Sequence, residues 1–405
     1  MSELQALLTP VGLELLDALG SVESTDEVAR AVSRLRADGH SPELVSAVVG
    51  QAHLRAKAGA KFGPFAERML FTRAGLEQAT RLGVAARHAQ RMRSAGLTRI
   101  ADLGSGIGGD ALAFAGAGLD VLAVDADPVT AAIAAYNLAP FGESATVQHG
   151  TAESADLDGR DAVWMDPARR TAGHSETRRV SPDDYSPSLD WAFALASRVP
   201  TGIKLGPAHD RDALPADAEA QWVSADGSVV ELVLWTGALA RAGVRRAALV
   251  IRGERSHELT AGADAVDAEV RPLGAFLHEP DGAVIRARLI GDVARSLDAG
   301  MLDEKIAYLT SDAALTSPFV QSFRVRETMA ANPKAINAVL RANDIGTLEI
   351  KKRGVDIDPA QFRKKLTLRG AASATLILVR VGDQRRAILA DRVSAAEEVS
   401  PLWPR

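Results

Sequence analysis

The sequence predicts an α/β protein with a doubly wound sheet of seven strands, a helical N-terminal lobe and a small C-terminal α+β domain. Three observations predict this arrangement. Apolar residues recur at three- and four-residue spacings before residue 95, which is the period of amphipathic helices. Short apolar strands then alternate with helices over residues 97–236, as a doubly wound sheet requires. Beyond residue 319, strands alternate with two helices that open at Asn-Pro and Asp-Pro pairs.

The length and composition of the chain limit its organisation and chemistry. We divide the 405 residues into a helical lobe (1–96), the α/β domain (97–236), a connecting region (237–318) and the C-terminal domain (319–405). The absence of cysteine excludes disulfides, thiolate metal sites and a cysteine nucleophile, and we expect no metal. The N-terminus does not follow the pattern of a signal peptide, and no apolar run reaches membrane-spanning length. We therefore expect a cytoplasmic protein that has no membrane partner.

The helices of the N-terminal lobe begin at capping residues. Ser24 and Ser41 each precede a helical segment, and Pro42 stands at a first helical position. The helical pattern breaks at residues 61–63 (KFG) and resumes after residues 68–73 (RMLFTR). Two functions suit this lobe: a helical cap over one side of the sheet, or part of a substrate site.

The most informative stretch is residues 99–110 (RIADLGSGIGGD). It predicts a buried strand, a glycine turn and the start of a helix. Glycines let a ligand approach the backbone where a Cβ atom would block it. The helix start offers unpaired N–H groups to a carboxylate or phosphate. The stretch therefore predicts a nucleotide-like cofactor, against the alternative of a glycine turn that binds no ligand.

Two cofactors compete for this turn. Gly104, Gly106 and Gly109 match the dinucleotide fingerprint, and Asp125 closes the second strand where a ribose-binding acid belongs. On this interpretation the protein is a dehydrogenase that binds NAD.

The pattern Asp-x-Gly-x-Gly-x-Gly over residues 102–108 also resembles the glycine motif of class I S-adenosylmethionine-dependent methyltransferases. In that family the acid and the glycine loop meet the amino-acid end of the cofactor, and the acid that closes the second strand takes the ribose hydroxyls. The resemblance implies a seven-stranded Rossmann-like sheet with S-adenosylmethionine as cofactor. The cofactor-binding residues it implies here are Asp102, Gly104, Gly106, Gly108, Asp125 and Ala126.

A third cofactor contact follows the strand predicted at residues 145–149. In the class I family this corner contacts the adenine, frequently through an acid directly after a glycine. Here Thr151 follows Gly150, so we assign the contact to the backbone of Ala152 and to Glu153.

The strand predicted at residues 161–165 ends in residues 166–170 (DPARR). Open α/β sheets place their chemistry just beyond the carboxyl ends of strands. The turn resembles the Asp/Asn/Ser-Pro-Pro motif of nucleic-acid amino-methyltransferases, which decides for the methyltransferase against the dehydrogenase. The resemblance implies catalytic roles for Asp166 and Pro167, with Arg169 holding a phosphate or a base edge. The same turn is similar to that of RNA methyltransferases acting on pyrimidine carbon five, which attack through a cysteine that this chain lacks.

The rest of the α/β domain follows the same pattern. We expect strands at 201–205, 219–224 and 229–235, the last two joined by a hairpin at Asp226-Gly227. Lys204 either faces the site or is a solvated strand-end lysine. The polar stretch 171–188 is either a loop that holds the substrate or a slack loop, and the arginines beside the site favour the first. The segments 61–62 and 68–73 loosely resemble the N-terminal lobe of trimethylguanosine synthase-like methyltransferases, which implies a substrate lobe.

The connecting region is expected to hold a small sheet of its own, with a strand at 245–252 and a helix at 284–297. In the C-terminal domain we expect strands at 319–325, 347–352, 374–381 and 385–390 and helices at 333–342 and 359–368.

Basic residues concentrate in the C-terminal domain of an otherwise acidic chain. Residues 321–370 contain eleven Lys or Arg and five Asp or Glu, a balance of +6, so the rest of the −5 chain carries −11. This clustering indicates contacts to a phosphate backbone, against the alternative of a solvated helix face. The candidate RNA-binding residues are Lys351, Lys352, Arg353, Arg363, Lys364 and Lys365. The segment resembles the THUMP-like domain at the C-terminus of a family of bacterial class I methyltransferases, which implies an RNA-directed enzyme.

We therefore predict an S-adenosylmethionine-dependent methyltransferase that modifies a nitrogen or oxygen of a tRNA or rRNA nucleotide by direct displacement. Two alternatives remain open. One is a methyltransferase for a small molecule or protein, and the other is an RNA-binding protein with a vestigial cofactor fold.

Overall fold

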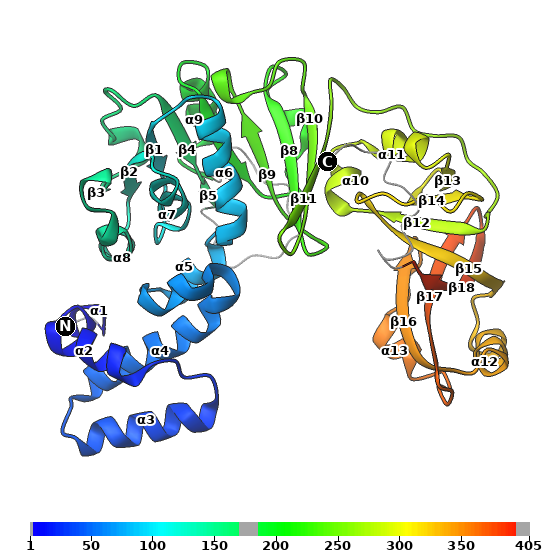
Figure 1. The fold of residues 1–405 in the computed structure, drawn as a ribbon, viewed down its shortest axis with the longest axis horizontal. Helices are drawn as coiled ribbons and strands as arrows, with labels where there is room; N and C mark the ends of the chain where they lie inside the picture. The colour runs from blue at the N-terminus through cyan, green and yellow to red at the C-terminus, as the bar shows by residue number, and fades with distance from the viewer. Residues whose placement is uncertain (1–2, 170–184, 394–405) are drawn as a thin grey trace. The chain divides into compact units, whose positions relative to one another are not determined.

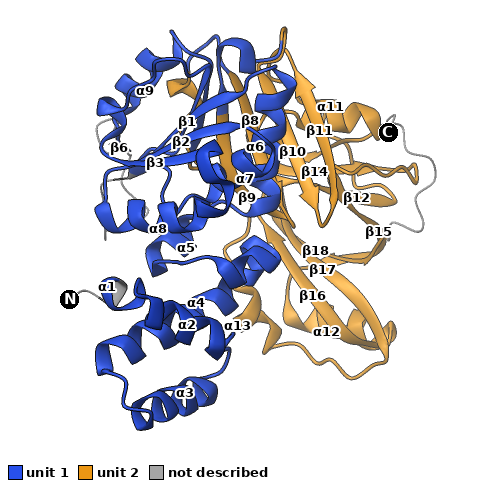
Figure 2. Cartoon of the chain, turned by 60° about the vertical axis from the view of Figure 1, so that its left-hand side comes forward, with its two compact units in different colours: residues 1–205, 215–218, 234–241 blue, residues 206–214, 219–233, 242–405 orange. Residues whose placement is uncertain are grey.

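The computed structural model describes residues 3–169 and 185–393, and the chain divides into two compact units (Figures 1 and 2). The first unit contains Met1–Leu205, Pro215–Ala218 and Leu234–Arg241, and the second contains Gly206–Leu214, Glu219–Val233 and Ala242–Arg405. Within the described residues, no helix combines the length and apolar character needed to cross a membrane.

The N-terminal lobe of the first unit is helical, as predicted. Its elements are α1 (Glu3–Leu7), α2 (Pro10–Leu19), α3 (Thr25–Ala37), α4 (Pro42–Phe62), the 3₁₀ helix η1 (Gly63–Arg68), α5 (Arg73–Gln78) and α6 (Leu82–Ser94). Capping residues begin these helices: Ser24 and Glu27 form a reciprocal capping box at α3, and the Ser41 hydroxyl accepts the Leu44 N–H at α4. The long helix α4 packs against α1, α2 and α3 and supports the lobe.

A parallel sheet forms the centre of the first unit. Its strands are β1 (Arg99–Leu103), β2 (Asp120–Asp125), β3 (Ala145–His149), β4 (Ala162–Met165) and β7 (Thr201–Leu205), in the spatial order β7-β4-β1-β2-β3. The helices of this part are α7 (Gly109–Gly116), α8 (Pro128–Leu138) and α9 (Leu189–Ala196), with the 3₁₀ turns η2 (Ala139–Ser144) and η3 (Ala152–Ser154). Leu103 pairs in register with Val124 and Met165, so β1, β2 and β4 end at one edge. The turns after these strands therefore meet there.

Within the described residues this sheet has nine strands, where seven were expected. Its order is β11-β10-β8-β9-β7-β4-β1-β2-β3, with β8 (Glu219–Ala225), β9 (Ser228–Trp235), β10 (Arg246–Arg252) and β11 (Arg255–Ala261). The Asp226-Gly227 turn between β8 and β9 has positive φ at both residues, which fits the predicted hairpin. Two strands of the connecting region, β10 and β11, extend the seven-strand order because β10 pairs in parallel with β8.

The second sheet has seven strands and belongs to the second unit. Its order is β13-β14-β12-β15-β18-β17-β16, with β12 (Phe276–Pro280), β13 (Gly300–Asp303), β14 (Ile306–Ser311), β15 (Val320–Ala330), β16 (Ile345–Arg353), β17 (Ala372–Val381) and β18 (Gln384–Arg392). The expectation of a separate small sheet in the connecting region is therefore wrong: its strands are shared between the two large sheets. The backbone N–H and C=O groups at an open strand edge are satisfied by pairing with a neighbouring strand. Local periodicity does not indicate which strand that neighbour is.

The helices of the second unit also differ from expectation. The helix expected over 284–297 is two short helices, α10 (Gly282–Arg286) and α11 (Ile290–Ser296), separated by Arg288 with φ of 57°. The helix α12 (Pro333–Ala342) has the predicted bounds, whereas α13 (Pro359–Arg363) ends five residues before the predicted position 368. Leu376 and Leu378 pack toward α12 and α13, and their neighbours Ile377 and Val379 face a second core on the other side of the sheet.

Candidate active site

The glycine turn between β1 and α7 has the shape that the sequence predicts. Gly104, Gly106 and Gly108 have φ values of 82°, 55° and 84°, a left-handed region that disfavours side chains. The N–H groups of Gly104 and Ser105 donate to the Val124 carbonyl at 2.9 and 3.0 Å, which ties the turn to β2.

The glycine turn and the turn after β4 lie directly against each other. A Cβ atom added at Gly104 would lie 3.2 Å from the Asp166 carbonyl oxygen, closer than ordinary packing allows. Glycine at 104 is therefore required for its conformation and also for the approach of the turn that carries Asp166. The two motifs predicted separately thus form one site at the carboxyl edge of the parallel strands.

Asp102 places a buried acid without a hydrogen-bond partner at this edge. Its side chain is 1% exposed, and neither carboxylate oxygen has a hydrogen-bond partner among the described residues. Burial, and then the charges of Asp110 and Asp166, raise the pKa of Asp102 well above its ordinary value. A buried carboxylate without a partner is costly, so this position fits a cationic ligand group such as an ammonium.

Asp125 closes β2 and holds the glycine turn. Its Oδ2 accepts the Gly106 N–H at 2.9 Å, and its Oδ1 accepts the Asp127 N–H at 2.9 Å. Burial is the largest influence and raises the pKa of Asp125, against the lowering effect of these N–H donors. Each oxygen keeps a further lone pair, so the carboxylate can still accept from a hydroxyl.

The two remaining cofactor positions lie at the ends of neighbouring strands. Ala126 is exposed, and its carbonyl lies 3.2 Å from His149 Nε2 at the end of β3. Ala152 and Glu153 lie in η3, with Ala152 half-buried and Glu153 exposed. Among residues 3–169 and 185–393, Glu153 has no partner that would identify its role, so its contact with adenine stays a prediction.

Lys204 is the direct ionic partner of Asp166. Its Nζ lies 2.6 Å from Asp166 Oδ2 and donates to Thr80 Oγ1 at 3.0 Å. The Lys204 side chain is 14% exposed and the Asp166 side chain is 36% exposed. The lysine is therefore mostly buried, while the carboxylate is partly accessible from solvent. Of the two alternatives that the sequence left open for Lys204, the structure supports the one that faces the site.

The turn after Asp166 continues into a short ribbon. Pro167 is buried, and β5 (Ala168–Arg169) pairs with β6 (Tyr185–Ser186). The Arg169 side chain, and most of the expected substrate loop 171–188, lie outside the described residues. The assignment of Arg169 to a phosphate or base edge therefore stays a prediction.

A buried polar chain extends from Lys204 into the protein. Thr80 donates to Asp110 Oδ2 at 2.8 Å, and His88 Nδ1 lies 2.8 Å from Asp110 Oδ1. Burial alone would raise the pKa of Asp110, but His88, the charge of Lys204 and the hydrogen bond from Thr80 together lower it. The His88 ring stacks on Trp164 of β4, with 4.3 Å between ring centroids. This series of buried hydrogen bonds fixes the elements that carry Asp166 and Lys204. The sequence patterns did not predict it.

Lys61, one of the basic residues singled out in the N-terminal lobe, has a structural role. Its Nζ donates to the carbonyls of Leu76, Glu77 and Ala79 at 2.8, 2.7 and 2.8 Å, at the end of α5. Burial, followed by the nearby charge of Lys204, lowers the pKa of Lys61. A lysine in this position satisfies the open carbonyls at a helix end.

The extended segment that follows η1 is held by side chains from two directions. Both amide atoms of Gln51 in α4 bond to the backbone of Phe71, at 2.6 and 3.0 Å. Asn137 in α8 bonds to both backbone groups of Leu70 and to the Ile107 carbonyl of the glycine turn. The N-terminal lobe is thereby connected to the cofactor loop through buried amides that bond to the backbone.

The cations predicted to bind RNA fall into two groups. Lys351 Nζ lies 2.6 Å from Glu279 Oε2, and Arg353 Nη2 lies 3.7 Å from Glu279 Oε1. Arg353 also lies over the Tyr308 ring, 5.1 Å from its centroid. These contacts join β16, at one edge of the second sheet, to β12 and β14, so both cations help to close the sheet around its core.

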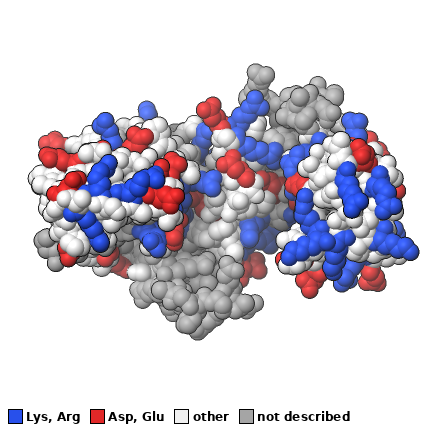
Figure 3. Space-filling model, turned by 90° about the horizontal axis from the view of Figure 1, so that it is seen from below, with Lys and Arg blue, Asp and Glu red and all other residues white. Residues whose placement is uncertain are grey.

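The second group is exposed. Lys352, Arg363, Lys364 and Lys365 are all exposed, although one Arg363 guanidinium nitrogen donates to the Leu348 carbonyl. Figure 3 shows lysine and arginine side chains gathered over the C-terminal domain, at the right of the view. The proposal of phosphate contacts therefore rests mainly on Lys352, Lys364 and Lys365.

The sheet order, the glycine turn and the acids after β1, β2 and β4 define a class I S-adenosylmethionine-dependent methyltransferase. Comparison with known proteins agrees. The chain is 33% identical over 358 residues to an uncharacterised S-adenosylmethionine-dependent methyltransferase of Mycobacterium tuberculosis CDC 1551, covering 86% of this chain and 95% of the relative. The protein of strain H37Rv matches equally. The chain belongs to this family of S-adenosylmethionine-dependent methyltransferases.

Two further comparisons concern parts of the chain and the fold. Residues 320–392 match the family described as THUMP domain-like, and residues 1–58 match a domain of unknown function (DUF8688). The crystal structure of a proposed methyltransferase from Porphyromonas gingivalis W83 superposes with a TM-score of 0.70 at 19% identity, covering 92% of this chain and 100% of that chain. The two proteins share a fold.

The residues present fit S-adenosylmethionine. Asp102 is a buried carboxylate that needs a positive partner, the glycine turn leaves its backbone open to a ligand, and Asp125 can accept from hydroxyls. As the family resemblance implies, Asp102 and the glycine turn would hold the amino-acid end of the cofactor, and Asp125 would hold the ribose.

Proposed function

We propose that this methyltransferase modifies a nitrogen or oxygen atom of an RNA nucleotide by direct displacement. S-adenosylmethionine supplies a methyl group that is already activated on its sulfonium. The task of the protein is then to align the attacking atom and to exclude competing geometries. The observation that carries the proposal is the position of Asp166, whose turn meets the glycine loop at Gly104.

Asp166 is suited to orient a nucleophile. The Lys204 ammonium at 2.6 Å favours the ionised carboxylate, which accepts hydrogen bonds and donates none. A substrate amino or hydroxyl group that donates to Asp166 would have its lone pair directed by that bond. Pro167 is buried, which holds the turn in one conformation. Because the chain has no cysteine, a covalent adduct through a thiolate is excluded.

The C-terminal domain supports RNA as the substrate class. It matches the THUMP domain-like family, and it exposes Lys352, Lys364 and Lys365 within one small domain. Lysines act as point charges toward phosphates, so these residues would position RNA without reading its sequence.

The test compares modified nucleosides, by mass spectrometry, in RNA from cells with and without this gene. We expect one methylated nucleoside to disappear on deletion, to return with the wild-type gene and not to return with Asp166→Ala. If RNA from both strains carries the same nucleosides while the protein methylates a peptide or small molecule, RNA is not the substrate.

A further inference from the structure

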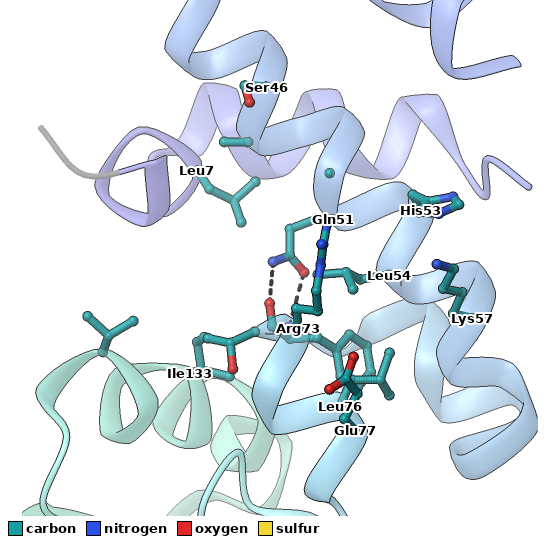
Figure 4. A pocket seen from close by; sticks show the side chains of 15 residues that line it. Leu7, Ser46, Gln51, His53, Leu54, Lys57, Arg73, Leu76, Glu77 and Ile133 are labelled. Atoms are coloured by element: carbon teal, nitrogen blue, oxygen red, sulfur yellow. Dashed lines mark hydrogen bonds between the residues drawn. The ribbon is translucent and has the colours of Figure 1, made fainter. Parts of the chain in front are cut away.

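The first unit contains a cavity that the cofactor site does not use. It has a volume of about 630 Å³ and lies among α4, the segment from Phe71 to Glu77 and the first turns of α8 (Figure 4). This volume lies within the range of pockets that hold small ligands, roughly 300–1,000 Å³.

One part of the cavity wall is apolar. Leu54, Phe71, Leu76 and Ile133 contribute side chains from three different elements. The backbone groups at Phe71 are already satisfied by Gln51, which Figure 4 shows as two dashed lines. This part of the wall therefore offers a ligand apolar surface without competing polar groups.

The charged groups of the cavity are two cations and one acid. Lys57 and Arg73 are exposed side chains on α4 and α5, and Glu77 lies one turn beyond Arg73. Figure 4 shows Arg73 extending from α5 toward α4, with Leu54 beside it and Lys57 beyond. His53 also lines the cavity, but its Nδ1 lies 3.1 Å from the Val22 carbonyl. The cavity thus presents a positive charge of two against one carboxylate.

We infer that this cavity binds a nucleoside 5′-phosphate unit. Arginine forms paired hydrogen bonds with phosphate oxygens, and a neighbouring lysine adds a second positive charge. The apolar wall suits the flat face of a base, and the Glu77 carboxylate can accept from an exocyclic amino or a ribose hydroxyl group. A plain inorganic anion would leave the apolar wall unused, and an apolar ligand would leave both cations unpaired.

The same chemistry has two sources, a free mononucleotide and a nucleotide within an RNA strand. If the proposed function holds, the RNA strand is the source, because the cavity borders α8, the helix that begins directly after Asp127 and two residues beyond Asp125. A nucleotide held there would position the substrate strand beside the cofactor domain.

The test titrates the full-length protein by calorimetry in the presence of saturating S-adenosylhomocysteine, which blocks the adenosine pocket. The probes are AMP, UMP, adenosine and a ten-nucleotide single-stranded RNA. We expect the mononucleotides to bind, adenosine to bind at least tenfold more weakly than AMP, and both Arg73→Gln and Lys57→Gln to weaken AMP at least tenfold. Arg36→Gln removes the same charge from the exposed surface of α3 and should leave AMP binding unchanged.

The source follows from the RNA probe. If the RNA binds at least tenfold more tightly than AMP and loses this advantage in Arg73→Gln, the cavity takes a nucleotide of a strand. If AMP binds and the RNA does not, the ligand is a free mononucleotide.

The inference is overturned if no mononucleotide binds, or if the Arg73 and Lys57 variants bind AMP like wild type. Unchanged affinity for S-adenosylhomocysteine confirms that each variant is folded. If Arg73→Gln does not fold, Lys57→Gln provides the test, because Lys57 is at an exposed helix position. Binding of AMP through Arg73 without methylation of RNA would uphold the cavity and reject the proposed function. Methylation of RNA without any nucleotide binding in the cavity would uphold the proposed function and reject the cavity as a nucleotide site.

Discussion

Lys204 Nζ and Asp166 Oδ2 lie 2.6 Å apart, at the ends of the adjacent parallel strands β7 and β4. Asp166 belongs to an evident sequence motif, whereas Lys204 does not. The pair also connects the site to the buried chain through Thr80, Asp110 and His88. Lys204 is therefore a positioning residue for the proposed chemistry: it orients Asp166 and favours its ionised state.

Replacing Lys204 by Met should impair methyl transfer much more than cofactor binding. Without the ammonium the Asp166 carboxylate loses its fixed orientation, and a displacement of about 1 Å costs on the order of 100-fold in rate. Single-turnover kinetics on RNA from the deletion strain measures the step, and calorimetry measures affinity for S-adenosylmethionine. Lys204→Arg should recover part of the rate. Wild-type rates in Lys204→Met would show that the ion pair has no part in the reaction.

Asp102 should make the unliganded protein less stable as pH rises. Its folded-state pKa is raised, so the folded protein binds more protons than the unfolded chain, and stability falls as pH increases from the ordinary value of 3.8 upward through the folded pKa. Asp102→Asn should remove this slope and raise the melting temperature near pH 8, while weakening S-adenosylmethionine by about 10- to 100-fold. A variant with wild-type pH dependence of unfolding and wild-type affinity would contradict the assignment.

Asp125→Ala should weaken the binding of S-adenosylmethionine by about 1–3 kcal/mol, which is the usual cost of leaving polar groups unpaired. The substitution removes the acceptor for the Gly106 and Asp127 N–H groups as well as the proposed ribose contact. Calorimetry with methionine as a second ligand, which has no ribose, separates the two effects. Methionine affinity should change much less than S-adenosylmethionine affinity. An equal loss for both ligands would mean that Asp125 only holds the turn.

The buried His88–Asp110 pair should contribute more to stability than an exposed pair. Removing His88 leaves the Asp110 carboxylate buried without its main partner, so His88→Ala should lower the free energy of unfolding by about 3–5 kcal/mol. Arg271→Ala breaks a 3.6 Å pair with Asp298, in which the two side chains are 50% and 78% exposed, and should cost about 0–1 kcal/mol. Urea denaturation of both variants measures the difference, and comparable losses would argue against the proposed importance of the buried chain.

The two groups of cations in the C-terminal domain should respond differently. Replacing Lys352, Lys364 and Lys365 together by Gln should reduce the salt dependence of RNA binding by roughly two to three units, about 0.7–0.9 per lost phosphate contact. Lys351→Met should instead destabilise the domain by about 1–3 kcal/mol, because Glu279 loses its closest partner. An unchanged salt slope in the triple variant would identify these lysines as a solvated surface.

The parts of the fold that local sequence determines were predicted well. The strands β3 and β7 have the predicted bounds, the helix α12 does too, and β2 ends at Asp125 as predicted. Apolar runs, capping residues and the glycine turn act over a few residues, so they can be recognised without knowing the tertiary structure. The approach of Gly104 to Asp166 also follows, since parallel strands place their carboxyl ends together.

Features that depend on distant residues were not visible in the sequence. Lys351 lies in a basic run, but its partner Glu279 is 72 residues away and on another strand. His88 and Asp110 are hydrogen-bonded across 22 residues, and although Asp110 ends the glycine-rich stretch 99–110, nothing in the sequence connects it to His88. The strands β10 and β11 join the large sheet because β10 pairs with β8, a choice that hydrophobic periodicity does not encode.

The most direct test of the account is methyl transfer by Asp166→Ala. Tritiated S-adenosylmethionine would be held at saturation over wild-type and variant enzymes, with RNA from the deletion strain as acceptor, and one turnover would be followed. The account predicts rapid labelling of one RNA nucleoside by wild type and a loss of at least about 100-fold in the variant, at unchanged cofactor affinity. Labelling of RNA by the variant at the wild-type rate, or no labelling of RNA by either enzyme, would contradict it.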